Sequence, residues 1–208
     1  MGELRRASEV RQAELVDAAL RLIATRGIAA LTTRALAEAV GLSSGAIFRH
    51  FASLEELLGA VVTRVEEVVD ATFPAATAPP LERLQRFITA RSAAVGKQLG
   101  ILRLVLSEQF LLSLPPGAST RLAACVRRTH AFVVECVRQG QLQGQLRDDL
   151  PAEALAPIVM GTIQMLALSS ASGRQRAADA TAVRAALLTL LAPCAPALTR
   201  ASAERDPS

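Results

Sequence analysis

The sequence predicts an all-α protein, and three observations support this prediction. Alanine and leucine, both strong helix formers, are abundant among the 208 residues. Apolar residues recur at helical spacing, whereas the alternating pattern of a β-strand is missing throughout. Prolines and glycines interrupt the periodic stretches, as they do between helices.

The first two expected helices lie near the N-terminus. One covers residues 8–26 and ends at Gly27, because glycine readily adopts the left-handed conformation that closes a helix. The other covers residues 33–40, with Thr32 as its N-cap. Its expected buried residues are Leu36, Ala37 and Val40.

A tight turn is expected to follow at Gly41. Ser43 then caps a third short helix over residues 44–50. Ile47 and Phe51 lie one helical turn apart and are expected to point inward. Two short helices joined by a glycine-containing turn form a helix-turn-helix.

A longer helix is expected next. Ser53 and Glu56 form a capping box that starts a helix ending at about Asp70. The expected apolar ridge of this helix is Leu57, Leu58, Val61, Val62, Val65 and Val68. The stretch FPAATAPP, residues 73–80, breaks the helix and marks a domain boundary.

The remaining chain is expected to be helical as well. The expected helices cover residues 81–96, 99–113, 118–142, 151–171 and 179–192. Pro151 suits the first turn of its helix, and Pro157 is expected to kink that helix near its start. The expected divisions are an N-terminal domain over 1–53, a connecting helix over 54–72, a helical domain over 73–200 and a disordered tail over 201–208.

Composition limits the class of protein. The N-terminus has no apolar region of a signal peptide, and no apolar run reaches the roughly 18 residues of a membrane span, so we expect a cytoplasmic protein without membrane contact. Three widely spaced cysteines, Cys125, Cys136 and Cys194, favour reduced thiols over disulfides. The net charge is +4, but residues 1–70 hold eight arginines against ten acidic residues, so bulk charge argues little for nucleic-acid binding.

The pattern of the third helix is typical of a DNA-recognition helix. Such a helix places its N-terminal residues against base edges while its other face packs on the preceding helix. The small residues Ser44, Gly45 and Ala46 permit a close approach to bases, and Phe48 and Arg49 are expected to face outward.

The stretch ALTTRALAEAVGLSSGAIFRHFASLEELL resembles the DNA-binding signature of the TetR family of transcriptional regulators, and the resemblance extends over roughly residues 10–58. It implies DNA contacts at Thr33, Arg34, Ser44, Gly45, Ala46, Phe48, Arg49 and His50. Two positions depart from the family pattern, because Phe48 stands where Tyr is usual and Leu54 where Lys is usual. The loss of two phosphate contacts would weaken binding, and an N-terminal arm carrying Arg5, Arg6 and Arg11 is a hypothetical compensation.

The resemblance also implies a homodimer formed by the last two long helices. The apolar residues expected there are Leu155, Ile158, Val159, Thr162, Ile163, Leu166, Ala167, Leu187, Leu188, Leu190 and Leu191, with Gly161 permitting close approach. Two recognition helices about one DNA turn apart would then read a near-palindromic operator in double-stranded DNA.

The family usually binds a small-molecule inducer between its middle helices. Candidate pocket residues here are Phe87, Arg91, Leu106, Phe110, His130, Phe132, Gln164 and Met165. At helical spacing such residues are more often ordinary core residues than pocket contacts. Because aromatic residues are scarce, an aliphatic ligand is favoured over a flat polyaromatic one.

No metal site or cofactor is expected. Cys125 and Cys136 are eleven residues apart on one helix, about 16 Å along its axis, so they cannot share a zinc ion with His130. The leading interpretation is a dimeric, sequence-specific DNA-binding regulator, a repressor that a small apolar ligand releases from its operator. A helical adaptor with weak DNA binding is the alternative, and an enzyme is the least favoured, because no catalytic motif is present.

Overall fold

The computed structural model describes residues 2–97, 101, 114–169 and 174–194, and the regular structure within them is helical throughout. The elements are α1 (Gly2–Arg26), the short 3₁₀ helix η1 (Ile28–Ala30), α2 (Thr33–Val40), α3 (Ser44–Ile47), α4 (Leu54–Asp70), α5 (Pro80–Lys97), α8 (Pro116–Leu142), α9 (Ala152–Ser169) and α10 (Arg174–Leu191). The all-α prediction is confirmed.

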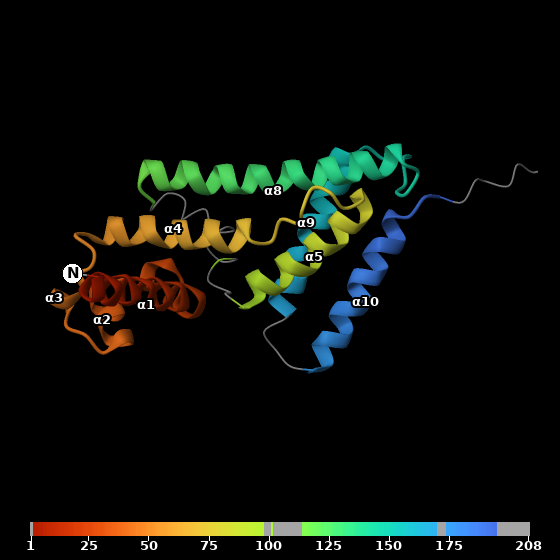
Figure 1. Ribbon diagram of the computed structural model, residues 1–208. Helices are drawn as coiled ribbons and strands as arrows, with labels where there is room; N and C mark the ends of the chain where they lie inside the picture. Colours follow the sequence, from red (N-terminus) through yellow and green to blue (C-terminus); the bar gives the residue numbers. More distant parts are fainter. Residues whose placement is uncertain (1, 98–100, 102–113, 170–173, 195–208) are drawn as a thin grey trace, which may run out of the picture.

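The helices form an elongated molecule with two ends (Figure 1). The elements α1, α2 and α3 gather at one end, and α4 leads from them toward the middle of the molecule. There α8 lies alongside α4, and α5, α9 and α10 make up the other end. The helix α4 is therefore the main connection between the first three helices and the rest of the chain.

Local side-chain bonds start the short helices where the sequence predicts them. The Thr32 hydroxyl accepts a hydrogen bond of 3.1 Å from the Ala35 amide, which caps α2. The Ser43 hydroxyl accepts one of 3.2 Å from the Ala46 amide, which caps α3. Between the two helices Gly41 has a φ of 67°, the left-handed conformation expected of this turn.

The cap of α4 differs in detail from the predicted capping box. The Ser53 hydroxyl accepts from the Glu56 amide at 3.1 Å, as expected. The Glu56 carboxylate, however, accepts from the amide of Ala52 at 2.6 Å, one residue before the cap. The two reciprocal hydrogen bonds therefore fix both the first turn of α4 and the backbone of Ala52 before it.

Several predicted boundaries are corrected by the structure. The first helix begins at Gly2 rather than residue 8, so Arg6 and Arg11 lie on α1 and not on an extended arm. The third helix ends at Ile47, and residues 48–50 form a turn. The last helix begins at Arg174. The expected helix over 99–113, apart from residue 101, and the expected tail over 201–208 lie outside the described residues.

The buried side chains form two hydrophobic clusters. The first unites α1 to α4 and extends to Val95 on α5, Cys125 on α8 and Ala167 on α9. The second lies among α5, α8, α9 and α10. The predicted ridge of α4 is buried except for the half-buried Val68, and Val69 is buried as well. The first core therefore crosses the boundary predicted at residues 73–80.

None of the helices in the described parts of the chain has the length and apolar character needed to span a membrane.

Candidate functional site

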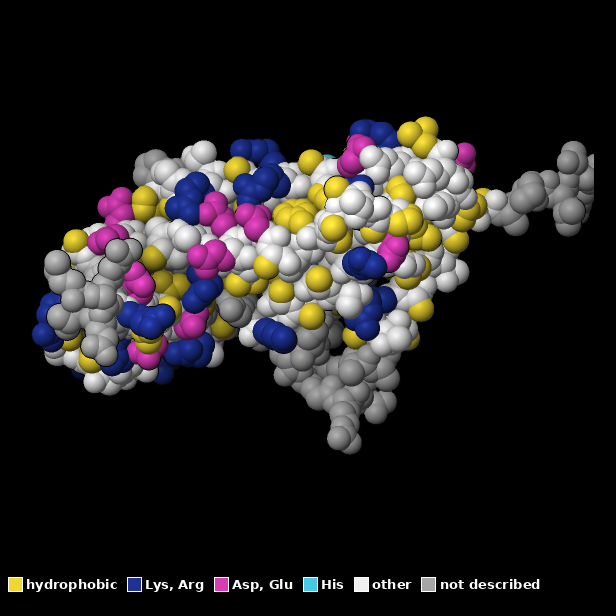
Figure 2. Space-filling model, viewed as in Figure 1, with side chains coloured by type: hydrophobic (Ala, Val, Ile, Leu, Met, Phe, Trp, Pro, Cys, Tyr) yellow, Lys and Arg dark blue, Asp and Glu magenta, His cyan; other side chains and the backbone are white. Residues whose placement is uncertain are grey.

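The helix-turn-helix presents a group of side chains at one end of the molecule. Arg34, Ser44, Gly45, Phe48 and Arg49 are exposed, and Thr33 and His50 are half-buried. On the face shown in Figure 2, basic and acidic side chains are interspersed over this end. The end therefore offers separate cationic groups rather than one uniformly positive patch.

The two exposed arginines of this group have different surroundings. Arg34, whose side chain is 87% exposed, lies 3.1 Å from the Glu38 carboxylate one turn along α2. For Arg49, the described residues provide no ion-pair partner. An exposed pair of this kind is worth only about 0.3–0.5 kcal/mol, so Arg34 can exchange Glu38 for a phosphate at little cost.

His50 is fixed to the first helix. Its backbone carbonyl accepts a hydrogen bond of 2.8 Å from the Gln12 side chain. Its Nδ1 lies 3.5 Å from the Ser8 hydroxyl. These two contacts hold the turn after α3 against α1, so His50 has a structural role whether or not it also reaches DNA.

Ala46 departs from the predicted set of DNA contacts. Its side chain is only 6% exposed, because it faces the packed side of α3 together with Ile47. The methyl group is therefore not available for a contact with a base. The small residues that remain exposed at the start of α3 are Ser44 and Gly45.

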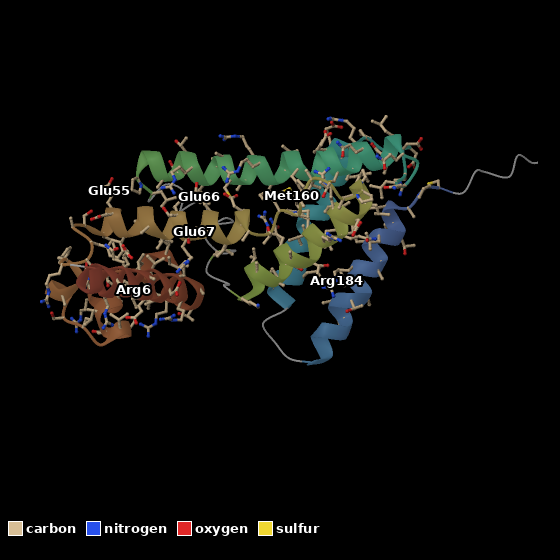
Figure 3. All side chains as sticks on the ribbon, viewed as in Figure 1. Arg6, Glu55, Glu66, Glu67, Met160 and Arg184 are labelled. Atoms are coloured by element: carbon tan, nitrogen blue, oxygen red, sulfur yellow. The ribbon has the colours of Figure 1, made fainter. Side chains whose placement is uncertain are left out.

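A cavity of about 180 Å³ lies between α4, α5, α8 and α9. Its wall is mostly apolar, and Arg91, Thr129 and Gln164 are the polar residues of the wall besides Cys125. The lining residues are Val69, Arg91, Val95, Ile101, Cys125, Val126, Thr129, Met160, Ile163, Gln164 and Ala167. Met160, labelled in Figure 3, marks the position of the cavity on α9, which packs against both α5 and α8.

Among the described residues of the cavity wall Arg91 is the charged one, and it is 6% exposed. Its Nε donates to the Thr72 hydroxyl at 2.7 Å, its Nη1 to the Thr129 hydroxyl at 3.2 Å, and its Nη2 to the Val69 carbonyl at 3.1 Å. Burial lowers the pKa of Arg91 to about 10. The guanidinium therefore remains charged at neutral pH, although desolvation opposes that charge.

Three aromatic rings support this guanidinium. The Arg91 guanidinium carbon lies 4.7 Å from the ring centre of Phe87 and 5.1 Å from that of Phe73. Phe132 packs against both rings, with centroid distances of 4.8 Å and 5.1 Å. The rings stabilise the cation through their π-faces, but they provide no compensating negative charge.

The predicted pocket residues have several different positions. Arg91 and Gln164 line the cavity, whereas Phe87 and Phe132 lie in the aromatic cluster beside it. His130 is exposed on α8, and Met165 is 61% exposed on α9, so neither lines the cavity. Leu106 and Phe110 lie outside the described residues.

Sequence reasoning missed most of the wall. Val69, Val95, Cys125, Thr129, Met160 and Ile163 line the cavity, and each follows the periodicity of an ordinary core residue. The available signal was Thr129, a polar residue at the buried spacing of its helix between Cys125 and Val133. Burial raises the pKa of the Cys125 thiol, which makes it a poor nucleophile.

The fold and the exposed groups of α2 and α3 define a helix-turn-helix DNA-binding protein. Residues 15–61 match the family model described as bacterial regulatory proteins, tetR family. Residues 15–61 therefore match the DNA-binding domain of TetR-family regulators, and relatives described as transcriptional repressors support a regulator of this family, as the resemblance predicted.

Known proteins agree with this assignment over most of the chain. The transcriptional repressor KstR2 of Mycobacterium tuberculosis is 28% identical over 160 residues, which cover 73% of this chain and 77% of KstR2. The solved structure of KstR2 has a TM-score of 0.77 at 24% identity and covers 88% of this chain and 95% of that one. The structure of AibR with isovaleryl coenzyme A and operator DNA has a TM-score of 0.72 at 18% identity and covers 87% and 97%.

Proposed function

We propose that the chain is a dimeric repressor that leaves a near-palindromic DNA operator when a small, mainly apolar molecule enters the cavity. One observation supports the coupling most strongly. Val69, Val95, Cys125 and Ala167 line the cavity and also belong to the hydrophobic cluster that contains the helix-turn-helix. Because packed cores shift rather than deform smoothly, a ligand that displaces these side chains moves α4 and the helices attached to it.

The proposed DNA contacts come from α2, α3 and the turn after α3. In this arrangement α3 enters the major groove, Arg49 reaches a base edge or phosphate, and the start of α2 faces a phosphate. The proposed contact residues are Thr33, Arg34, Ser44, Gly45, Phe48, Arg49 and His50. Their accessibility supports this assignment: Thr33 and His50 are half-buried, and the other five residues are exposed.

The proposed dimer forms through α9 and α10. Both helices carry large apolar side chains on the surface: Ile158 and Leu168 on α9, and Val183 and Leu190 on α10. Exposed apolar side chains on two neighbouring helices favour association with a second copy through a two-fold axis. The functional divisions are then a DNA-binding unit over 1–53, a connecting helix over 54–72 and a ligand and dimer unit over 73–200.

The relatives support repression and a ligand response. KstR2 is described as a transcriptional repressor, and AibR has been crystallised with isovaleryl coenzyme A and operator DNA. A branched aliphatic acyl group is of the small apolar kind that this cavity suits.

Selection of DNA by the purified protein tests the proposal. Randomised duplexes would be enriched over successive rounds and sequenced, with binding at physiological salt. We expect two half-sites with two-fold symmetry and centres about 10 base pairs, or a multiple of that, apart. Enrichment of a single asymmetric site, or of no sequence at all, would contradict a dimeric operator-binding protein.

A further inference from the structure

No carboxylate among the described residues forms an ion pair with Arg91, although the charge of Asp70 acts on it from farther away and favours its charged form. Its polar partners Thr72, Thr129 and Val69 are two hydroxyls and one carbonyl, all uncharged. Asp70 is exposed and forms its ion pair with Arg128 at 2.9 Å. Buried charges in folded proteins are normally paired, so a cation that lines a cavity without a carboxylate beside it points to an anion brought by a ligand.

The hydrogen-bonding capacity of Arg91 fits one carboxylate. A guanidinium has five N–H donors, and the three bonds of Arg91 leave two donors without a partner among the described residues. A carboxylate has two acceptor oxygens and pairs with arginine in a bidentate manner. A phosphate with close to two charges would need more cationic partners than the described residues of this wall provide.

The rest of the cavity fits a hydrocarbon group of limited size. Its other lining residues are mostly aliphatic, with Thr129 and Gln164 as polar neighbours. An apolar cavity of about 150 Å³ is known to hold benzene, and the volume here is about 180 Å³. The body of the ligand should therefore be close to a single six-membered ring or a short branched chain.

We propose that the cavity binds a small monocarboxylate whose hydrocarbon body fills the apolar wall and whose carboxylate is the counter-ion of Arg91. The regulatory consequence rests on the function proposed above. The same guanidinium donates to the Val69 carbonyl at the C-terminal end of α4 and to the Thr72 hydroxyl, which itself donates to that carbonyl at 2.6 Å. A carboxylate that attracts Arg91 weakens these bonds and loosens the end of the helix that carries the DNA-binding unit.

Pairs of acids and neutral amides test the proposal on the wild-type chain. Isovalerate, benzoate and cyclohexanecarboxylate would each be compared with the matching amide at equal concentration and at pH 7.5, by thermal unfolding and by calorimetric titration of the full-length protein. We expect at least one acid to bind saturably and about tenfold or more tightly than its amide, because charge-assisted hydrogen bonds are lost with the amide. The proposal is overturned if no acid binds, or if the amides bind equally well.

Two variants and one control locate the binding. Arg91→Gln should weaken binding of the acid about tenfold or more and abolish its preference over the amide. Arg86→Gln, an exposed arginine on the same helix paired with Glu82, should leave the affinity unchanged. Ala167→Leu fills the cavity and keeps Arg91, so it should abolish binding. This second variant provides a test of the cavity if Arg91→Gln does not fold. Binding that survives a folded Arg91→Gln or the Ala167→Leu change would place the acid elsewhere.

Measuring the affinity for the selected operator with and without the acid distinguishes a failure of this inference from a failure of the proposed function. An acid that binds should raise the Kd of the wild-type protein for its selected DNA at least tenfold, whereas the amide should not. Operator binding that responds to no acid would overturn the ligand chemistry and leave the DNA-binding function in place. Absence of any selected operator would instead overturn the proposed function.

Discussion

Glu38 forms an ion pair with Arg34, the basic side chain that the start of α2 would offer to a phosphate. Arg34 and Glu38 form an exposed pair at 3.1 Å, which competes only weakly with a phosphate. We predict that Glu38→Gln increases operator affinity and steepens the dependence of log K on log salt by up to about 0.9, one phosphate contact. Glu82→Gln, the same change in the equivalent pair with Arg86 on α5, is the control and should alter neither quantity. Equal salt slopes for all three proteins would show that Glu38 does not compete with DNA for Arg34.

Gly41 joins α2 to α3 in a backbone conformation that other residues adopt at a cost. Its φ is 67°, and a Cβ added there would meet no atom within 4 Å, so any penalty comes from the backbone itself. Gly41→Ala should therefore lower the free energy of unfolding by about 1–2 kcal/mol. Gly59→Ala in the middle of α4, where a Cβ also has open space, should raise it by about 0.5–1 kcal/mol. Urea denaturation measures both, and a stabilising Gly41→Ala would contradict the turn geometry.

At the scale of the element, α4 depends on its N-cap. The Ser53 hydroxyl accepts the hydrogen bond of the Glu56 amide, and the helix that it starts connects the DNA-binding unit to the cavity. Ser53→Ala should lower the free energy of unfolding by about 1 kcal/mol. Ser53→Asp retains an acceptor at the cap and should keep most of the stability. Equal losses in the two variants, measured by chemical denaturation, would mean that the cap bond contributes nothing.

Two ion pairs join α4 to α8, one with the largely buried carboxylate of Glu66 and one that is exposed. Arg121 binds the Glu66 carboxylate and donates to the Thr63 hydroxyl at 2.8 Å, and Arg128 binds Asp70. Figure 3 shows Glu66 on the side of α4 that faces α8. The exposed pair of Arg128 with Asp70 contributes little stability and is screened by salt, so this pair opposes a shift of α4 along α8 only weakly.

Helix starts and turns could be predicted from the sequence because their bonds are local. Thr32, Ser43 and Ser53 each accept from an amide three residues later, and such spacing is visible in the chain itself. The bonds of Arg91 join residues 19 and 38 positions away, which no local pattern contains. Arg91 and His130 are both polar residues in amphipathic helices, yet one is buried and the other exposed. Only the packing of α5 and α8 against their neighbours decides between these two outcomes.

At the scale of the whole molecule, the proposed dimer forms through the surface of α9 and α10. Leu190 on α10 is 63% exposed, and Leu142 at the end of α8 is 82% exposed. We predict that Leu190→Glu converts the dimer to a monomer, because an interface cannot bury an unpaired carboxylate without a large desolvation cost. Leu142→Glu makes the same chemical change outside the proposed interface and should remain dimeric. Light scattering after size exclusion measures the mass, and a dimeric Leu190→Glu protein would place the interface elsewhere.

Binding of the selected operator by the wild-type, Arg49→Ala and Arg86→Ala proteins tests the central claim most directly. Arg49 lies at the end of the helix-turn-helix without an ion-pair partner among the described residues, whereas Arg86 is exposed on α5, away from the proposed contacts. Fluorescence anisotropy across a salt series should show tight, salt-sensitive binding that Arg86→Ala leaves unchanged. Arg49→Ala should weaken it by about 1–3 kcal/mol, the value of a lost base contact. Equal affinities for the operator and for random DNA, unchanged in Arg49→Ala, would contradict the account.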